Sequence, residues 1–179
     1  MATAAQTLPP LSTLSKQVAE WVAAVRELTQ ADQVYWVEGS DAEHGEFIGE
    51  LQASGELHKL NEEHYPNCFL ARSHPSDVAR VEHLTFVCTT DQEDAGPNNH
   101  WMAPDEAKAK MNALFSGCMK GRTLYVVPYC MGPIDSPYSR CGVEITDSAY
   151  VVLNMLIMTR AGRPSPELLP RPGRRCKGG

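Results

Sequence analysis

Several common sequence signals are missing from this chain of 179 residues. No apolar run reaches the roughly 20 residues that a membrane-spanning helix needs. The first residues, MATAAQ, lack the charged start and apolar core of a secretory signal. The six cysteines form no Cys-x-x-Cys pair, and no His pair stands near them at metal-ligand spacing. We therefore expect a cytoplasmic protein with reduced thiols, no membrane partner and no metal-binding residue.

The phosphate-binding pattern Gly-x-x-x-x-Gly-Lys-Ser/Thr is also missing, so no nucleotide-binding residue is predicted. Lys120-Gly121-Arg122, which follows Gly117, is the nearest cationic turn, but it leads into a strand pattern instead of opening a helix. We interpret it as a structural turn. The formal net charge of −6 disfavours nucleic acid as a partner.

The positive charge is concentrated at one end of the chain. Residues 160–179 carry six Lys/Arg and one Asp/Glu. From residue 163 to residue 179 there are four prolines and little apolar content, which predicts a disordered basic tail rich in Pro, Arg and Gly. Residues 1–11 are small, polar and proline-containing, and we expect a flexible arm there. One folded unit is therefore predicted over residues 12–162.

Helical and strand patterns alternate in the first half of this unit. A helix from Ser12 is predicted by apolar residues at helical spacing, which are Leu14, Val18, Trp21, Val22, Val25 and Leu28. A strand is expected over 33–37. Ser40 and Glu43 form a capping box that opens a second helix, with Phe47, Ile48 and Leu51 inward and Gly55 at its end. Further strands are expected over 67–71 and 84–89, a loop over 90–101, and a helix from Pro104 through Leu114.

The stretch from Ser116 to Gly162 organises the rest. Residues 123–129 are β-branched and aromatic without polar alternation, which predicts a strand covered on both faces. A Gly-Pro loop, a second strand and a helix follow, with Ser148 as the expected N-cap and Gly162 as the expected end. The alternation favours an α/β fold, a mixed sheet with flanking helices.

Three segments of this stretch resemble a known family. GCMKGRTLYVVPYCMGP, then GVEITDSAYVV, then MTR occur in the same order in the GTP-dependent phosphoenolpyruvate carboxykinases. The resemblance covers roughly residues 12–162 and implies the fold of that family's amino-terminal domain, incomplete here because family members are several times longer. It stops abruptly after residue 162, so we hypothesise a truncation or a frameshift at that point, with a genuine basic tail as the alternative.

The resemblance also implies a reaction, the GTP-dependent conversion of oxaloacetate to phosphoenolpyruvate, CO2 and GDP in gluconeogenesis, by a monomeric carboxy-lyase. In the family, Mg²⁺ accompanies the nucleotide and Mn²⁺ occupies a separate site. The family's metal ligands, its Gly-Lys-Thr phosphate loop, its reactive cysteine and its guanine pocket belong to sequence that this chain does not contain. We therefore expect no tightly bound cofactor, no confidently assigned catalytic residue, and a fragment that is inactive alone.

Arg80 is the one candidate substrate-binding residue. The segment Ser76–Glu82 resembles a mobile loop whose arginine contacts the carboxylate or phosphate of the substrate. A guanidinium suits that role because it offers paired donors and stays charged. From the residues alone, Arg80 would instead be an exposed arginine paired with Asp77 or Glu82. Glu82 stands where the family has a glutamate that helps to close an active-site lid, and an ordinary surface carboxylate is the equal alternative.

Two other functions remain open at this point. The chain could be a noncatalytic module that binds a dicarboxylate or another subunit, or an interaction protein acting through its basic tail. Cys118, Cys130 and Cys141 are expected to be buried small side chains. Asp147 is expected to support the start of the following helix instead of binding metal.

Overall fold

Strand β6 (Thr123–Met131) is the centre of the fold. The computed structural model describes residues 16–72, 81–133, 136 and 138–162, so the predicted arm and basic tail lie outside it. β1 (Gln33–Trp36) pairs in parallel with β6, while β7 (Arg140–Thr146) and β8 (Arg160–Ala161) pair with it antiparallel. The predicted mixed sheet is confirmed.

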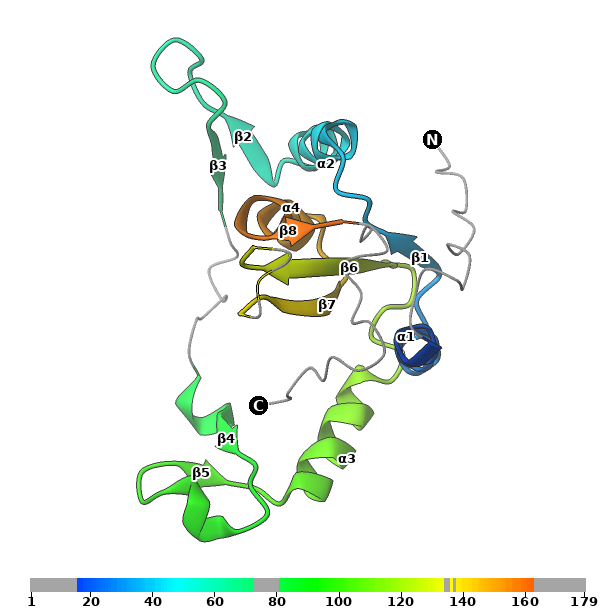
Figure 1. Cartoon of the computed structure of the whole chain (residues 1–179), viewed down its shortest axis with the longest axis vertical. Helices are drawn as coiled ribbons and strands as arrows, with labels where there is room; N and C mark the ends of the chain where they lie inside the picture. Colours follow the sequence, from blue (N-terminus) through cyan, green and yellow to red (C-terminus); the bar gives the residue numbers. More distant parts are fainter. Residues whose placement is uncertain (1–15, 73–80, 134–135, 137, 163–179) are drawn as a thin grey trace.

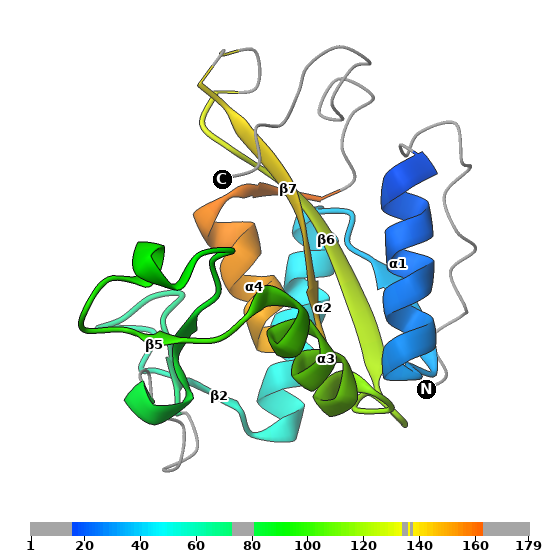
Figure 2. The ribbon, with the colours of Figure 1, turned by 90° about the horizontal axis from the view of Figure 1, so that it is seen from below.

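Helices cover both faces of this sheet (Figures 1 and 2). α1 (Lys16–Thr29) lies on one face, and α2 (Asp41–Ser54) and α4 (Ala149–Met158) lie on the other. Along β6, Leu124 and Val126 point into the core beside α1, whereas Tyr125 and Val127 point into the core beside α2 and α4. The prediction of a strand buried on both faces is therefore confirmed.

The turn between β1 and α2 is held by a buried carboxylate. Ser40 is the N-cap, and its hydroxyl accepts a hydrogen bond from the Glu43 amide at 3.2 Å. The Glu43 carboxylate reaches back to the amides of Gly39, at 2.7 Å, and Glu38, at 3.0 Å, and accepts the Tyr35 hydroxyl at 2.9 Å. The predicted capping box is present, but the Glu43 carboxylate accepts from the amides of Glu38 and Gly39, which precede the N-cap residue Ser40.

Several other predicted helix boundaries also match closely. α2 ends at Gly55, which adopts the left-handed conformation with φ 82°. α3 spans Pro104–Phe115, and Ser148 caps α4 by accepting a hydrogen bond from the amide of Val151 at 3.4 Å. These boundaries were predictable because each depends on a local cap or on proline at the first turn.

The segment between α2 and α3 differs from the prediction. It contains β2 (Leu57–Lys59), β3 (Phe69–Ala71), the 3-10 turn η1 (Glu82–Leu84), β4 (Phe86–Val87), the 3-10 turn η2 (Gln92–Ala95) and β5 (His100–Trp101). The hairpin partner β2 was not predicted. The strand expected over 84–89 is reduced to β4, and the loop expected over 90–101 contains η2 and β5. Figure 1 shows β4, β5 and α3 on the β7 side of the sheet, away from α2.

Two further expectations were wrong. Trp21 was placed on the inward face of α1, but its side chain is 46% exposed while Val22 is buried. Gly162 does not end α4, since that helix stops at Met158 with Thr159 as its C-cap. Gly162 follows β8, and its amide donates to the carbonyl of Pro128 at 2.9 Å.

Gly162 is instead required where two backbone segments cross. It has φ 128°, and a Cβ placed on it would lie 2.3 Å from the carbonyl oxygen of Glu38. A Cβ on Gly39, in the opposing turn, would lie 2.2 Å from the carbonyl oxygen of Ala161. The turn that Glu43 organises therefore packs backbone to backbone against the end of β8.

Gly162→Ala should reduce the free energy of unfolding by roughly 2–4 kcal/mol, because it adds backbone strain and a clash that no side-chain movement can relieve. Urea unfolding followed by circular dichroism measures the change. Gly49→Ala is the matched control: no atom lies within 4 Å of the added Cβ, and the site is inside α2. There the same substitution should stabilise by about 0.5–1 kcal/mol. Equal effects of the two substitutions would contradict the crossing.

Candidate functional site

The structure describes one of the two residues predicted for the substrate site. Arg80 lies outside the described residues. Glu82 is the first residue of η1, and its side chain is exposed. Its carbonyl accepts the Thr85 amide at 3.1 Å, and the carbonyl of Val81 accepts the Thr85 hydroxyl at 2.8 Å. The backbone at Glu82 is thus held by a tight turn while its carboxylate faces solvent.

A small unit held by its own contacts follows η1 in the chain. β4 pairs in parallel with β5, and the rings of Phe86 and His100 pack with centroids 5.9 Å apart. The indole of Trp101 donates to the carbonyl of Thr89 at 3.0 Å. The Asp91 carboxylate caps η2 by accepting from the Glu93 amide at 3.0 Å. Glu82 therefore lies just before this unit and outside the main sheet.

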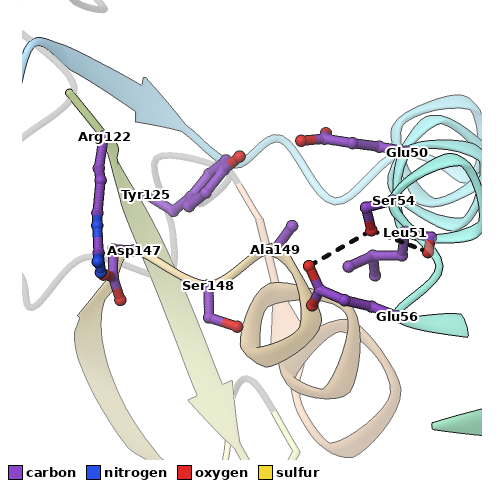
Figure 3. A pocket seen from close by; sticks show the side chains of 9 residues that line it. All are labelled: Glu50, Leu51, Ser54, Glu56, Arg122, Tyr125, Asp147, Ser148 and Ala149. Carbon is purple, nitrogen blue, oxygen red and sulfur yellow. Dashed lines mark hydrogen bonds and ion pairs between the residues drawn. The ribbon is translucent and has the colours of Figure 1, made fainter. Parts of the chain in front are cut away.

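A separate pocket of about 320 Å³ lies against the main sheet (Figure 3). It is bounded by the end of α2, the first half of β6 and the start of α4. Its lining residues are Glu50, Leu51, Ser54, Glu56, Arg122, Tyr125, Asp147, Ser148 and Ala149. Glu82 is not among them, and no sequence pattern pointed to this pocket.

The Arg122 guanidinium in this pocket is already paired. Arg122 forms an ion pair with Asp147, with side chains 61% and 36% exposed. Two more carboxylates, Glu50 and Glu56, line the same pocket. This balance of charge would repel a dicarboxylate or a phosphate, so the pocket does not qualify as a site for an anionic substrate.

The Lys120–Arg122 segment behaves as the structural turn that was predicted. The Gly121 amide donates to the Asp32 carboxylate at 3.0 Å, so an acidic side chain occupies a donor that a phosphate would need. The guanidinium of Arg122 is directed to Asp147, as Figure 3 shows. Asp147 thus joins the start of β6 to the start of α4, consistent with a structural role.

Burial changes the acidity of one pocket residue. The pKa of the Tyr125 hydroxyl is raised above its ordinary value, mainly by burial and secondarily by the negative charge of Glu50. The ring also packs edge-on against Tyr35 and Phe47, with centroids 5.7 Å apart in both cases. Tyr125 is therefore a neutral core residue at neutral pH.

The cysteine prediction is corrected in part. Cys130 is buried, as expected, but Cys118 is exposed and Cys141 is only half-buried. Cys118 lies in the turn between α3 and β6, where backbone hydrogen bonds hold the chain without needing a buried side chain. Within the described residues, no group of three or more His, Cys, Asp or Glu side chains could hold a metal ion.

Comparison with known proteins decides the family. The model of the phosphoenolpyruvate carboxykinase N-terminal domain matches residues 20–173. This chain belongs to the phosphoenolpyruvate carboxykinase family. The match begins within α1 and extends past the last described residue, so the predicted boundary at residue 162 stays a prediction. Of the described helices, none is long and apolar enough to cross a membrane.

Several curated relatives carry the name phosphoenolpyruvate carboxykinase (GTP). The protein of Chlamydia abortus is 54% identical over 147 residues, which cover 82% of this chain and 24% of that protein. The protein of Neocallimastix frontalis is 51% identical over 158 residues, covering 88% and 26%. The protein of Corynebacterium jeikeium is 48% identical over 166 residues, covering 93% and 27%. The chain thus spans about a quarter of the length of these GTP-dependent relatives.

Tyr125→Phe should make the free energy of unfolding fall less steeply as the pH rises in the alkaline range. The raised pKa means that the unfolded chain releases this proton near pH 10 while the folded chain still holds it, so stability falls as pH rises from there toward the folded pKa. The slope for this group approaches about 1.4 kcal/mol per pH unit, and the Phe variant lacks it. Urea unfolding between about pH 9 and pH 11 measures the slope. The control is Tyr65→Phe, at a position 58% exposed, and identical slopes in both variants would refute the assignment.

Proposed function

We propose that this chain is the amino-terminal part of a GTP-dependent phosphoenolpyruvate carboxykinase and contributes one edge of its substrate site. The whole enzyme would convert oxaloacetate and GTP to phosphoenolpyruvate, CO2 and GDP in gluconeogenesis. The observation that carries the proposal is the 54% identity to a carboxykinase over 82% of this chain. A cytoplasmic location and a monomeric whole enzyme are parts of the same proposal.

The proposed contribution to the substrate site is Arg80. Its guanidinium would hold a carboxylate or phosphate oxygen pair, because a planar fork of donors matches that geometry. Glu82, two residues further on, would serve lid closure through hydrogen bonds and not through proton transfer. Its side chain is exposed, on the turn that precedes β4, and is available for contact with further polypeptide.

Mn²⁺ and Mg²⁺ with GTP belong to the proposal for the whole enzyme. The described residues do not fit a divalent ion, since they contain no group of three ligating side chains. We therefore assign no metal or nucleotide step to these residues. The role left to this part of the enzyme is to position an anionic substrate and to close over it.

A subunit-interaction module is the second candidate, and a specific observation favours it. α3 contains no buried residue among its twelve, although it carries large apolar side chains. A dicarboxylate-binding module is less well supported, because the pocket beside α4 is lined by three carboxylates and one paired arginine. The carboxykinase proposal remains the stronger one, and the exposed apolar side chains of α3 are compatible with it.

We expect the purified 179-residue chain to show no GTP-dependent decarboxylation of oxaloacetate, because the family's metal and nucleotide residues are not in this sequence. The assay contains Mn²⁺, GTP and oxaloacetate and detects phosphoenolpyruvate by a coupled enzyme. A reaction without protein corrects for spontaneous loss of CO2 from oxaloacetate. Phosphoenolpyruvate formation that depends on both the chain and GTP would overturn the expectation.

The role of Arg80 requires a complete enzyme. We define the chimera as residues 1–162 of this chain joined to the remaining part of the Chlamydia abortus carboxykinase, which is 54% identical over the shared region. In the chimera, Arg80→Ala should lower kcat/KM for oxaloacetate. The loss should correspond to about 2 kcal/mol or more of transition-state stabilisation, with GTP affinity and thermal stability nearly unchanged. Arg80→Lys should restore only part of the loss, because an ammonium group lacks the planar fork.

Arg72→Ala is the matched control, since Arg72 is an exposed arginine eight residues earlier. It should leave kcat/KM for oxaloacetate within about twofold of the unsubstituted chimera, as expected for a surface charge. Equal losses in Arg72→Ala and Arg80→Ala would refute the substrate role. A loss of thermal stability as large as the kinetic loss would point instead to a surface ion pair of Arg80.

A further inference from the structure

Helix α3 has an apolar stripe that the described structure covers only in part. Ala107, Met111, Leu114 and Phe115 recur at the i, i+4, i+7 and i+8 positions, so they share one face of the helix. The side chains of Met111, Leu114 and Phe115 are 46%, 72% and 44% exposed. The same periodicity in α1 buries Val22 against the sheet. α3 therefore has the pattern of a packed helix, but its large apolar side chains are only partly packed.

The position of α3 is nevertheless fixed at both ends. Beyond its C-terminus, the Gly117 amide donates to the carbonyl of Leu28 and the Met119 amide to the carbonyl of Thr29, both at 2.9 Å. Before its N-terminus, the Met102 amide donates to the carbonyl of Val87 at 3.3 Å. Figure 1 shows the helix below α1 and β7. The stripe is thus held at a defined place on the molecule.

A twelve-residue helix gains little stability on its own and normally depends on tertiary contacts of its apolar face. The other side of α3 is suited to solvent, since it carries an ion pair between Lys110 and Glu106 at 2.8 Å. A single helix of this length, about 18 Å, is too short to supply the roughly 800 Å² per partner of a stable dimer. Contacts of α3 alone would therefore not hold two copies of this chain together.

We propose that the stripe of α3 (Ala107, Met111, Leu114 and Phe115) packs against the part of a GTP-dependent carboxykinase that has no counterpart in this chain. This inference rests on the proposed function. The matched region is only 24% of the Chlamydia abortus protein, so about three quarters of such an enzyme is polypeptide outside the structure. The occupant is an apolar surface of that polypeptide, bordered by polar groups that meet the charged flanks of α3.

Hydrogen–deuterium exchange of residues 104–115 tests directly whether further polypeptide packs against the stripe. We compare three proteins: the 179-residue chain, the chimera, and the intact Chlamydia abortus enzyme at its aligned helix. The α3 amides should exchange at least roughly tenfold more slowly in the chimera and in the intact relative than in the 179-residue chain, because packing suppresses local opening. Exchange in the intact relative as fast as in the 179-residue chain would overturn the proposal, whether or not the chimera folds.

A pair of substitutions tests which face of α3 is covered. Leu114→Lys lies on the stripe, and Ala113→Lys, its exposed neighbour on the other side of the helix, is the matched control. In the chimera, Leu114→Lys should lower the melting temperature and speed exchange of α3, while Ala113→Lys should do neither. In the 179-residue chain, neither substitution should matter. If Leu114→Lys and Ala113→Lys have equal effects in the chimera, the stripe is not the covered face.

Self-association of the 179-residue chain is distinguished from packing against further polypeptide by varying the protein concentration. Protection of α3 that rises with the concentration of the 179-residue chain, together with a dimer in analytical ultracentrifugation, would assign the stripe to a second copy and reject our proposal. Exchange needs no turnover, so the result is independent of catalysis. The α3 amides could be protected in an enzyme in which Arg80→Ala leaves the kinetics unchanged. That result would support this inference and refute the proposed substrate role of Arg80.

Discussion

Burial of β6 on both faces is the constraint on which the rest of this structure depends. Leu124, Val126 and Val127 are fully buried, and Tyr125 is 9% exposed, so both sides of one strand need a helical layer. α1 supplies one layer, and α2 with α4 supplies the other. A strand with apolar residues facing both sides cannot remain at a solvent-exposed surface, and it therefore imposes the three-layer arrangement.

The parts of the fold that were predicted from the sequence are those set by local chemistry. The Ser40–Glu43 cap, Gly55, Pro104 and Ser148 each mark a helix end through contacts within a few residues. The errors occur where distant residues decide the outcome. Gly162 resembled a helix end in sequence, but its role comes from a backbone crossing with Gly39, more than a hundred residues away, which no local pattern reveals.

The short strands show the same division. β2, β4 and β5 are two or three residues long, and each exists because a partner strand lies beside it. Periodicity needs a longer window than this to be informative. The candidate site was predictable only through family resemblance: one arginine and one glutamate in a polar loop carry no pattern of their own. The pocket beside α4 collects Glu50, Tyr125 and Asp147 from three distant segments, so no motif marks it.

Two regions of the described chain differ in how completely their apolar side chains are buried. Around β6, apolar side chains are buried, Glu43 has its hydrogen-bond donors, and glycines allow the close crossing of β8 with the β1–α2 turn. From η1 to α3, the backbone is ordered by short turns and paired strands, yet Leu84, Phe86 and Leu114 remain exposed. On our two proposals, the exposed side chain of Glu82 and the exposed stripe of α3 would both contact polypeptide that this chain does not contain.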